Sequence, residues 1–250
     1  MGKEYMTKLV IVGATSAIAQ ETAKCFARDG AELFLVARNR ERLEILAADL
    51  RIRGAQRVEL FELDVLDFER HQEMLDTAIE TLKGLDMLLI AHGTLGNQRA
   101  CEASVEETFE ELKRNALSVI SLLTISSNYF ERRRKGVIAV ISSVAGDRGR
   151  RSNYVYGTAK GAVSLFLQGL RGRLAKAGVA VVTIKPGFVD TPMTAHMRKG
   201  LLFAKPSTVG EDVYRAMQKR KEVVYTPWFW RYIMLIVRAI PERLFKYLSF

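Results

Sequence analysis

Tyr156 and Lys160 are the residues of this sequence whose types and spacing best suit chemistry. They stand four positions apart, and Ser142 and Ser143 lie a short distance upstream. On a helix, positions i and i+4 share a face, so a phenol and an ammonium group would point into one cleft. A neighbouring cation favours the phenolate, which lowers the pKa of the phenol toward the range of acid–base catalysis. A serine hydroxyl beside them would hold a carbonyl oxygen by a hydrogen bond.

The same spacing also arises in helices where a lysine is exposed beside a packed tyrosine. Whether the pair is catalytic therefore has to be judged from the surrounding elements. Apolar, strand-like runs cover residues 8–12, 32–37, 57–63, 87–91, 137–142, 179–185 and 222–225. Helical patterns follow the turn at residues 13–19, up to about residue 28, and cover residues 40–53, 69–83, 105–133, 154–177 and 208–219. Strand and helix in alternation predict parallel strands joined by right-handed crossover helices. We therefore expect an α/β fold with a doubly wound parallel sheet (Rossmann) in a single domain over residues 1–226.

A turn of small residues follows the first strand and opens the first helix. Such a turn lets the backbone approach a pyrophosphate, and the helix amino terminus supplies free N–H groups and a positive dipole end. The turn residues that we expect to contact a dinucleotide are Gly13, Thr15, Ser16, Ala17 and Ile18. Ala17 and Ala19 stand where dinucleotide turns usually have glycine, and each adds a methyl group. An ordinary tight strand–helix connection is the alternative.

The second strand ends in Ala37-Arg38-Asn39-Arg40, without an acidic residue. In dinucleotide folds an acid at this point holds the ribose 2′-hydroxyl of NAD, whereas arginine accommodates the 2′-phosphate of NADP. Arg38 therefore predicts NADP(H), with Arg40 or Arg42 assisting. NAD(H) stays open, because these arginines also suit a solvated helix start.

Composition and charge exclude several other classes of protein. The two cysteines, Cys25 and Cys101, make no disulfide framework, and the amino terminus lacks the apolar core of a signal peptide, so we expect a cytoplasmic protein. Three histidines without ligand spacing predict no metal site. The net charge is +10, but the basic residues are scattered, so we expect no nucleic-acid partner.

Taken in order and spacing, the motifs over residues 8–226 resemble the short-chain dehydrogenase/reductase family. They are the turn at Gly13, Asp64-Val65, Ala91-His92-Gly93, Asn115, Ser143, Tyr156-x-x-x-Lys160 and the segment from Pro186 to Thr191. Val12 and His92 depart from the family pattern, which usually has threonine at the first position and asparagine or alanine at the second. The resemblance implies an oxidoreductase that forms a homodimer or homotetramer.

The resemblance also implies roles for individual residues. Tyr156 would protonate a carbonyl oxygen, Lys160 would lower the Tyr156 pKa and bind the nicotinamide ribose, and Ser143 would orient the carbonyl. Asn115 would hold a water molecule that links Lys160 to solvent. The implied cofactor contacts are Asp64 and Val65 at the adenine, Ala91 and Gly93 at the nicotinamide ribose, and Val189 and Thr191 at the carboxamide, with Pro186 and Gly187 as further cofactor-binding residues.

Three positive charges, Arg148, Arg150 and Arg151, lie between the serine and the tyrosine. The loop that carries them must border the cleft. We expect Arg150 and Arg151 to bind an anionic group of the substrate, such as a phosphate. A solvated loop is the alternative.

Residues 227–250 form a tail with many aromatic and apolar side chains and with cations at intervals. Pro241 should divide it into two helices or end the first. The uncharged runs are too short to span a bilayer, but an amphipathic helical tail of this kind suits peripheral contact with the inner face of an anionic membrane. The alternatives are a dimer interface and a cover over the substrate pocket.

Segments around Arg150–Gly157, Pro186–Thr191 and the tail are similar to the reductase component of decaprenylphosphoryl-ribose 2-epimerase within that family. This similarity implies a 2-keto-pentose on a polyprenyl phosphate as the substrate, and NADH as the reductant, which conflicts with Arg38. The first hypothesis is thus an NAD(P)H-dependent reductase of a small or lipid-linked ketone. A reductase of another hydrophobic ketone, such as a 3-ketoacyl chain or a steroid, is the second. A non-catalytic dinucleotide sensor at the membrane is the third.

Overall fold

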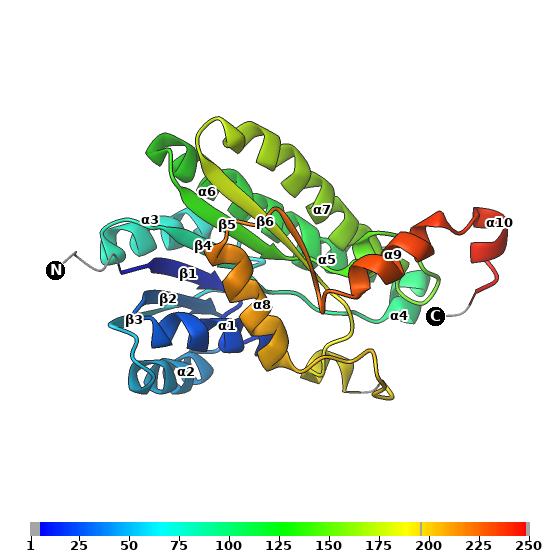
Figure 1. Cartoon of the computed structure of the whole chain (residues 1–250), viewed down its shortest axis with the longest axis horizontal. Coiled ribbons are helices and arrows are strands. Elements are labelled where there is room, and N and C mark those ends of the chain that lie inside the picture. The colour runs from blue at the N-terminus through cyan, green and yellow to red at the C-terminus, as the bar shows by residue number, and fades with distance from the viewer. Residues whose placement is uncertain (1–5, 196, 249–250) are drawn as a thin grey trace.

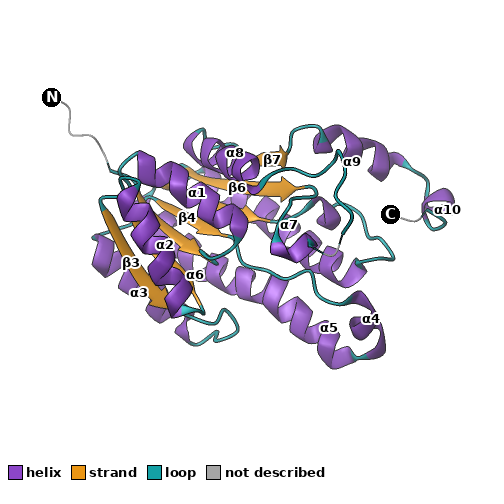
Figure 2. Cartoon of the chain, turned by 90° about the horizontal axis from the view of Figure 1, so that it is seen from below, coloured by secondary structure: helices purple, strands orange, loops and turns teal. Residues whose placement is uncertain are grey.

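The computed structural model describes residues 6–195 and 197–248 and shows a seven-stranded parallel sheet between two layers of helices (Figure 1, Figure 2). The strands are β1 Lys8–Val12, β2 Glu32–Ala37, β3 Arg57–Glu62, β4 Met87–Ile90, β5 Gly136–Ile141, β6 Val179–Pro186 and β7 Val223–Thr226. Their order is β3-β2-β1-β4-β5-β6-β7. The order reverses between β1 and β4, and open sheets bind ligands outside the carboxyl ends of strands at such a point. The predicted fold class is confirmed.

Alternation along β1 shows why the sheet is covered on both sides. Leu9 and Ile11 belong to one core, whereas Val10 and Val12 belong to the other. Successive side chains of a strand point to opposite faces, so a continuous apolar run needs helices on both. One face is covered by α1 (Ala17–Arg28), α2 (Arg40–Ile52) and α8 (Pro206–Gln218), and the other by α3 (Arg70–Leu82), α6 (Ser118–Arg133) and α7 (Tyr154–Ala175).

The predicted helix over residues 105–133 is interrupted. It consists of α5 (Val105–Leu112), a π-helical turn (Lys113–Leu117) and α6, and a short helix that was not predicted, α4 (Gln98–Ala103), precedes it. Asn115 Nδ2 donates to the Glu111 carbonyl at 3.3 Å, and Ser118 Oγ donates to the Arg114 carbonyl at 2.8 Å. Side chains that bond to carbonyls of the preceding turn compete with the backbone ladder, which favours a local bulge.

The tail forms two helices, α9 (Trp230–Ala239) and α10 (Glu242–Phe245), on either side of Pro241, as expected. They lie at the same end of the molecule as the long loop after β6 (Figure 1). Trp230 and Met234 are buried against Val144 in a small core of their own. Among the described residues, no helix has the length and apolar character needed to cross a bilayer.

Candidate functional site

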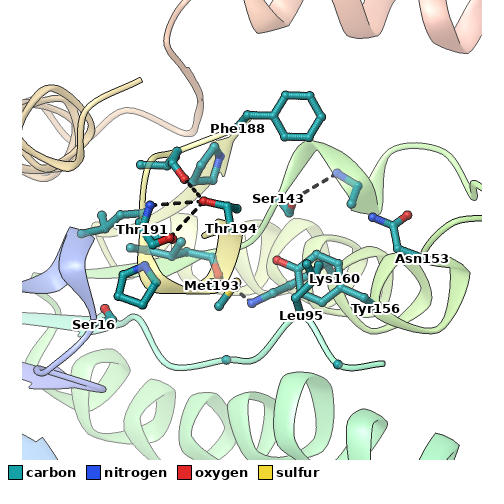
Figure 3. A pocket seen from close by; sticks show the side chains of 18 of the residues that line it. Ser16, Leu95, Ser143, Asn153, Tyr156, Lys160, Phe188, Thr191, Met193 and Thr194 are labelled. Atoms are coloured by element: carbon teal, nitrogen blue, oxygen red, sulfur yellow. Dashed lines mark hydrogen bonds between the residues drawn. The ribbon is translucent and has the colours of Figure 1, made fainter. Parts of the chain in front are cut away.

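A cavity of about 930 Å³ opens beside the carboxyl ends of the central strands (Figure 3). It extends from the turn after β1, past the loops after β4 and β5, to the start of α7 and the loop after β6. Of the residues predicted from the sequence, those that line it are Thr15, Ser16, Ala17, Ile18, Arg38, Ala91, Gly93, Ser143, Arg150, Tyr156, Lys160, Pro186, Gly187, Val189 and Thr191. The cavity therefore brings together segments that are far apart in the sequence.

The first turns of α7 place Tyr156 and Lys160 on one face, and the loop after β5 brings Ser143 to the same place (Figure 3). The Ser143 hydroxyl lies close enough to the Tyr156 phenol to lower its pKa, and Ser143 Oγ also accepts from the Ala145 N–H at 3.1 Å. Lys160 is 3% exposed, and its Nζ donates to the Ile141 carbonyl at 3.0 Å and lies 5.8 Å from the centroid of the Tyr156 ring. A hydroxyl, a phenol and an ammonium group thus converge beside one wall of the cavity.

The electrostatics of this group correct one expectation. The sequence predicts that Lys160 lowers the pKa of Tyr156, but burial raises the pKa of this phenol to about 12. The Ser143 hydroxyl and the charge of Arg150 act in the opposite direction without offsetting the burial. Burial also lowers the pKa of Lys160 to about 8, because the charged amine loses its hydration. The phenol therefore carries its proton at neutral pH.

Asn115 lies behind the cavity wall instead of in it. The side chain is fully buried in the π-helical turn, and its Oδ1 accepts a hydrogen bond from the Thr94 backbone N–H at 2.9 Å. Gly93 explains how it approaches the site: a Cβ built at this glycine would lie 2.7 Å from Asn115 Oδ1 and 3.3 Å from Lys160 Nζ. Only a residue without a side chain leaves room for both groups beside the cavity.

The turn after β1 fits a dinucleotide diphosphate. Gly13 has a φ of +79°, and a Cβ there would lie 2.5 Å from the backbone nitrogen of His92, so the turn is closed tightly against the loop after β4. Ser16 caps α1 by accepting from the Ala19 N–H at 3.3 Å, and Ala17 begins the helix at the cavity. Ala19 is fully buried in the core, so its methyl group does not narrow the cavity.

Some of the residues predicted to contact the adenosine half of the cofactor do not line the cavity. Arg38 and Arg42 line the cavity, whereas Arg40 is paired with Glu44 of its own helix at 2.9 Å. Asp64, Val65 and Arg151 are not among the lining residues. The carboxylate of Asp64 accepts from the Leu66 N–H at 3.0 Å, His71 contacts the Val65 carbonyl at 3.1 Å, and the Arg151 side chain is exposed.

Several lining residues were not predicted. One group follows β4 and consists of Leu95, Gly96 and Asn97 of the loop with Gln98 and Arg99 of α4. A second group follows β6 and consists of Phe188, Pro192, Met193, Thr194 and Met197, and a third, after β5, consists of Val144, Ala145, Ser152 and Asn153. The length of the loop over residues 187–205 was the one signal for the second group. The first group lines the cavity because β4 lies beside the point where the strand order reverses, and the sequence analysis did not predict the order of the strands in the sheet.

His92 also lines the cavity. Ser118 Oγ donates to the Arg114 carbonyl, so the His92 Nε2–H donates to Ser118 Oγ at 2.8 Å. His92 Nδ1 is buried without a partner. Burial, and then the charge of Lys160, lower the pKa of His92 to about 3, so the ring is neutral. This histidine braces the loop after β4 against α6.

Within residues 6–195 and 197–248, no group of His, Cys, Asp and Glu side chains is arranged to hold a metal ion.

Known proteins share this sequence and this fold. Residues 7–201 match the short chain dehydrogenase family. An uncharacterized oxidoreductase of Mycobacterium tuberculosis strain H37Rv is 34% identical over 234 residues, which are 94% of each chain. An uncharacterized oxidoreductase of Streptomyces coelicolor is 31% identical over 239 residues, covering 95% of this chain and 94% of the relative.

Among solved structures, an alcohol dehydrogenase from the archaeon Thermococcus sibiricus, complexed with 5-hydroxy-NADP, superposes with a TM-score of 0.79 at 26% identity, over 88% of this chain and 96% of the other. Levodione reductase has the same fold, with a TM-score of 0.80 at 21% identity, over 89% and 97% of the two chains. With the serine, tyrosine and lysine gathered at the switch point of a doubly wound sheet, these similarities show that the chain is an oxidoreductase that belongs to the short-chain dehydrogenase/reductase family.

Proposed function

We propose that this chain reduces a ketone with NADPH and that Tyr156 protonates the carbonyl oxygen. The observation that carries the proposal is the convergence of Ser143, Tyr156 and Lys160 in a cavity that also contains the turn after β1. When bound, the nicotinamide supplies the hydride. A neutral phenol, with its pKa raised to about 12, is the form that can donate a proton to the oxygen. The Ser143 hydroxyl would hold that oxygen, and the Lys160 cation would favour the departure of the phenol proton.

Substitution Tyr156→Phe tests this role. It removes the proton donor and keeps the ring, so turnover should fall by about 10²–10⁴-fold, while NADPH binding, measured by fluorescence, should persist. NADPH oxidation by the variant at the wild-type rate would refute the assignment. A wild-type chain that binds NADPH but reduces none of a panel of keto-sugars, ketoacyl thioesters and steroid ketones would favour the dinucleotide sensor.

The cofactor preference rests on the basic side chains at the adenosine end of the cavity. Arg38 and Arg42 line it, and the stretch after β2 contains no carboxylate before Glu41 to hold a ribose hydroxyl. We expect Arg38→Ala to lower kcat/KM for NADPH by about 10–100-fold, the value of one charged hydrogen bond, with little change for NADH. Arg40→Ala is the matched control, because Arg40 is bound to Glu44. A wild-type preference for NADH would contradict this assignment.

Arg150 supports an anionic substrate. It lines the cavity close enough to Tyr156 for its charge to act on the phenol, and burial lowers the pKa of its guanidinium. Among the described residues no carboxylate forms an ion pair with it, so a phosphate would supply the missing counter-charge. The cavity is also lined by the apolar side chains of Phe188, Met193 and Met197, which suits a chain of isoprene units. We therefore infer a keto-sugar on a polyprenyl phosphate, preferably a 2-keto-pentose.

The matched pair Arg150→Ala and Arg151→Ala tests the substrate class, because only the first residue lines the cavity. Arg150→Ala should raise KM for a phosphorylated lipid ketone about tenfold or more, and leave a neutral ketone nearly unchanged. Equal effects of the two substitutions would count against the phosphate. Higher turnover of a 3-ketoacyl chain or a steroid than of any keto-sugar lipid would favour the second hypothesis.

The outer face of the tail supports contact with a lipid surface. Trp228 is 70% exposed, Leu235 67%, Ile236 66% and Tyr247 76%, and the exposed cations around them are Arg231, Arg238, Arg243 and Lys246. Apolar side chains edged by cations are suited to the interface of an anionic membrane. A second copy of the chain would bring the same cations together, which disfavours a dimer through this face.

Sedimentation with phosphatidylglycerol vesicles and with neutral phosphatidylcholine vesicles tests the contact. We expect binding to the anionic vesicles alone and its loss in the double variant Trp228→Ser, Ile236→Ser. Leu165→Ser, at an equally exposed position on α7, is the control. Binding that survives the double variant would exclude this face, and concentration-dependent dimers that the variant abolishes would point to a second copy.

A further inference from the structure

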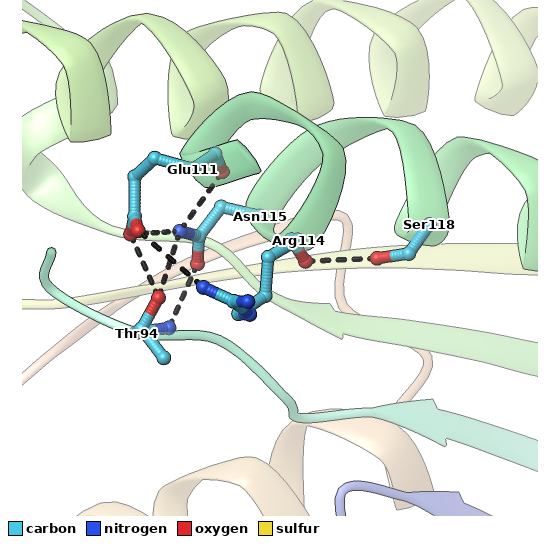
Figure 4. A network of polar contacts seen from close by, with 5 residues as sticks. All are labelled: Thr94, Glu111, Arg114, Asn115 and Ser118. Atoms are coloured by element: carbon cyan, nitrogen blue, oxygen red, sulfur yellow. Dashed lines mark hydrogen bonds and ion pairs between the residues drawn. The ribbon is translucent and has the colours of Figure 1, made fainter. Parts of the chain in front are cut away.

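A buried carboxylate lies behind the catalytic residues, near the end of α5. Glu111 is 6% exposed, and its Oε1 accepts hydrogen bonds from Asn115 Nδ2 at 2.5 Å and from Thr94 Oγ1 at 2.7 Å (Figure 4). Arg114 Nη1 lies 3.9 Å from the other oxygen. Two of these groups donate hydrogen bonds and the third is a cation, so the contacts suit an ionised carboxylate. A buried charge is costly unless it is paired and hydrogen-bonded, and this one is both.

The contacts of Glu111 reach the wall of the cavity. Thr94, which donates its hydroxyl to Glu111, donates its backbone N–H to Asn115. Asn115 Oδ1 and Lys160 Nζ lie on the same side of Gly93. Gly96 closes over the carboxylate from the same loop: its φ is +69°, and a Cβ there would lie 2.6 Å from the Glu111 carboxyl carbon. The loop after β4 is therefore fastened to α5 through this one side chain.

We propose that Glu111 is the buried counter-charge of the Tyr156–Lys160 pair and the positioning residue that holds Asn115 and Thr94 beside it. The proposal rests on the proposed reductase function. Reduction needs a protonated phenol and a lysine cation, and a negative charge behind them stabilises both forms. The charge of Glu111 raises the pKa of Tyr156 and the pKa of Lys160, and in Lys160 it opposes the lowering caused by burial.

Other charged and titratable groups face these residues from the neighbouring elements. Arg114 faces Glu111 from the π-helical turn, and Cys101 faces it from α4. His92 faces Lys160 from the loop after β4, and Arg150 faces Tyr156 from the loop after β5. His92 is neutral and Arg150 is positive, so Glu111 is the negative charge that acts on the pair among these groups.

The test is the pH profile of kcat/KM for ketone reduction in Glu111→Gln. The substitution removes the charge and keeps the size of the side chain. Because Glu111 raises the pKa of Tyr156 and the pKa of Lys160, its loss should lower both. The alkaline limb of the kcat/KM profile should therefore move to lower pH by roughly one pH unit. A merely structural role would lower activity without moving the limb. A folded Glu111→Gln protein with an unmoved limb would overturn the proposal.

The adjacent exposed ion pair supplies the matched controls. Glu110 and Lys113 are spaced as Glu111 and Arg114 are, but both are largely exposed. Glu110→Gln and Lys113→Gln should leave the limb in place, and a shift equal to that of Glu111→Gln would overturn the proposal.

Arg114→Gln gives an independent test if Glu111→Gln fails to fold, since the Arg114 side chain is 31% exposed. It removes the cation that partly neutralises Glu111, so the limb should move to higher pH. A limb that stays in place or falls would overturn the proposal. Failure of the reductase assignment gives a different result: the wild-type chain would reduce no ketone of the panel, or Tyr156→Phe would turn over at the wild-type rate.

Discussion

Arg148 fastens the tail to the loop that carries Ser143 and Arg150. Its Nη1 donates to the carbonyls of Val237 and Ile240, each at 2.6 Å, and to that of Arg238 at 3.2 Å. These carbonyls end α9, where a helix has free acceptors and the negative end of its dipole. The guanidinium carbon also lies 3.7 Å from the centroid of the Phe245 ring, so one side chain holds both helices of the tail.

Arg148→Ala should therefore loosen the tail without unfolding the domain. Two short charged hydrogen bonds at about 1.5 kcal/mol each, with a cation–π contact of about 1 kcal/mol, give a loss of about 4 kcal/mol in the free energy of local opening. The ion pair with Glu242 adds little, because that side chain is 81% exposed. Since about 1.4 kcal/mol corresponds to a factor of ten, hydrogen exchange in residues 230–248 should accelerate by roughly two to three orders of magnitude, up to the rate of the free chain.

Hydrogen exchange with mass spectrometry on peptides of the tail measures this directly. Glu242→Ala should change the exchange by less than about fivefold, and Arg243→Ala, at an exposed position of α10, should have no effect. Unchanged protection in Arg148→Ala would refute the inference that this residue anchors the tail. An effect of Glu242→Ala as large as that of Arg148→Ala would show that the ion pair, and not the capping of α9, holds the tail.

Two further predictions concern the cavity. Burial lowers the pKa of Lys160 to about 8, and reduction needs the cation, so kcat/KM for the ketone should fall as pH rises through about 8; a profile that stays flat to about pH 10 would contradict this. Gly187→Ala would place a Cβ 1.9 Å from Trp230 Nε1, so it should displace α9 and lower the stability by about 1–3 kcal/mol in thermal denaturation. Gly169→Ala is its control: nothing lies within 4 Å of a Cβ there, and alanine suits the middle of α7, so the melting temperature should hold or rise.

Local patterns allowed much of the fold to be predicted. The alternation of apolar strands and amphipathic helices depends on neighbours in sequence, and the parallel sheet agrees with it. The spacing of Tyr156 and Lys160 along one helix face is equally local, so the pair could be found without coordinates. The break at Pro241 follows from the missing N–H of proline and the clash of its ring with the preceding turn.

The electrostatics of the site required the tertiary structure. Spacing alone predicted that Lys160 would lower the Tyr156 pKa, but desolvation of the phenol has the larger effect, and burial is a property of the whole packed chain. No local pattern distinguishes Glu111 from Glu106, Glu107 and Glu110 in the same stretch, because its burial depends on the loop after β4, where Gly96 lies against its carboxyl group.

The three arginines of the loop after β5 show the same contrast between what the sequence determined and what the tertiary structure decided. The sequence determined that the loop with Arg148, Arg150 and Arg151 borders the cleft, because it lies between the serine and the tyrosine. The tertiary structure decided that the first caps a helix of the tail, the second faces the cavity and the third faces solvent. Type and spacing in the sequence determined which residues are candidates for chemistry, whereas what each side chain faces depends on contacts between segments that are distant in sequence.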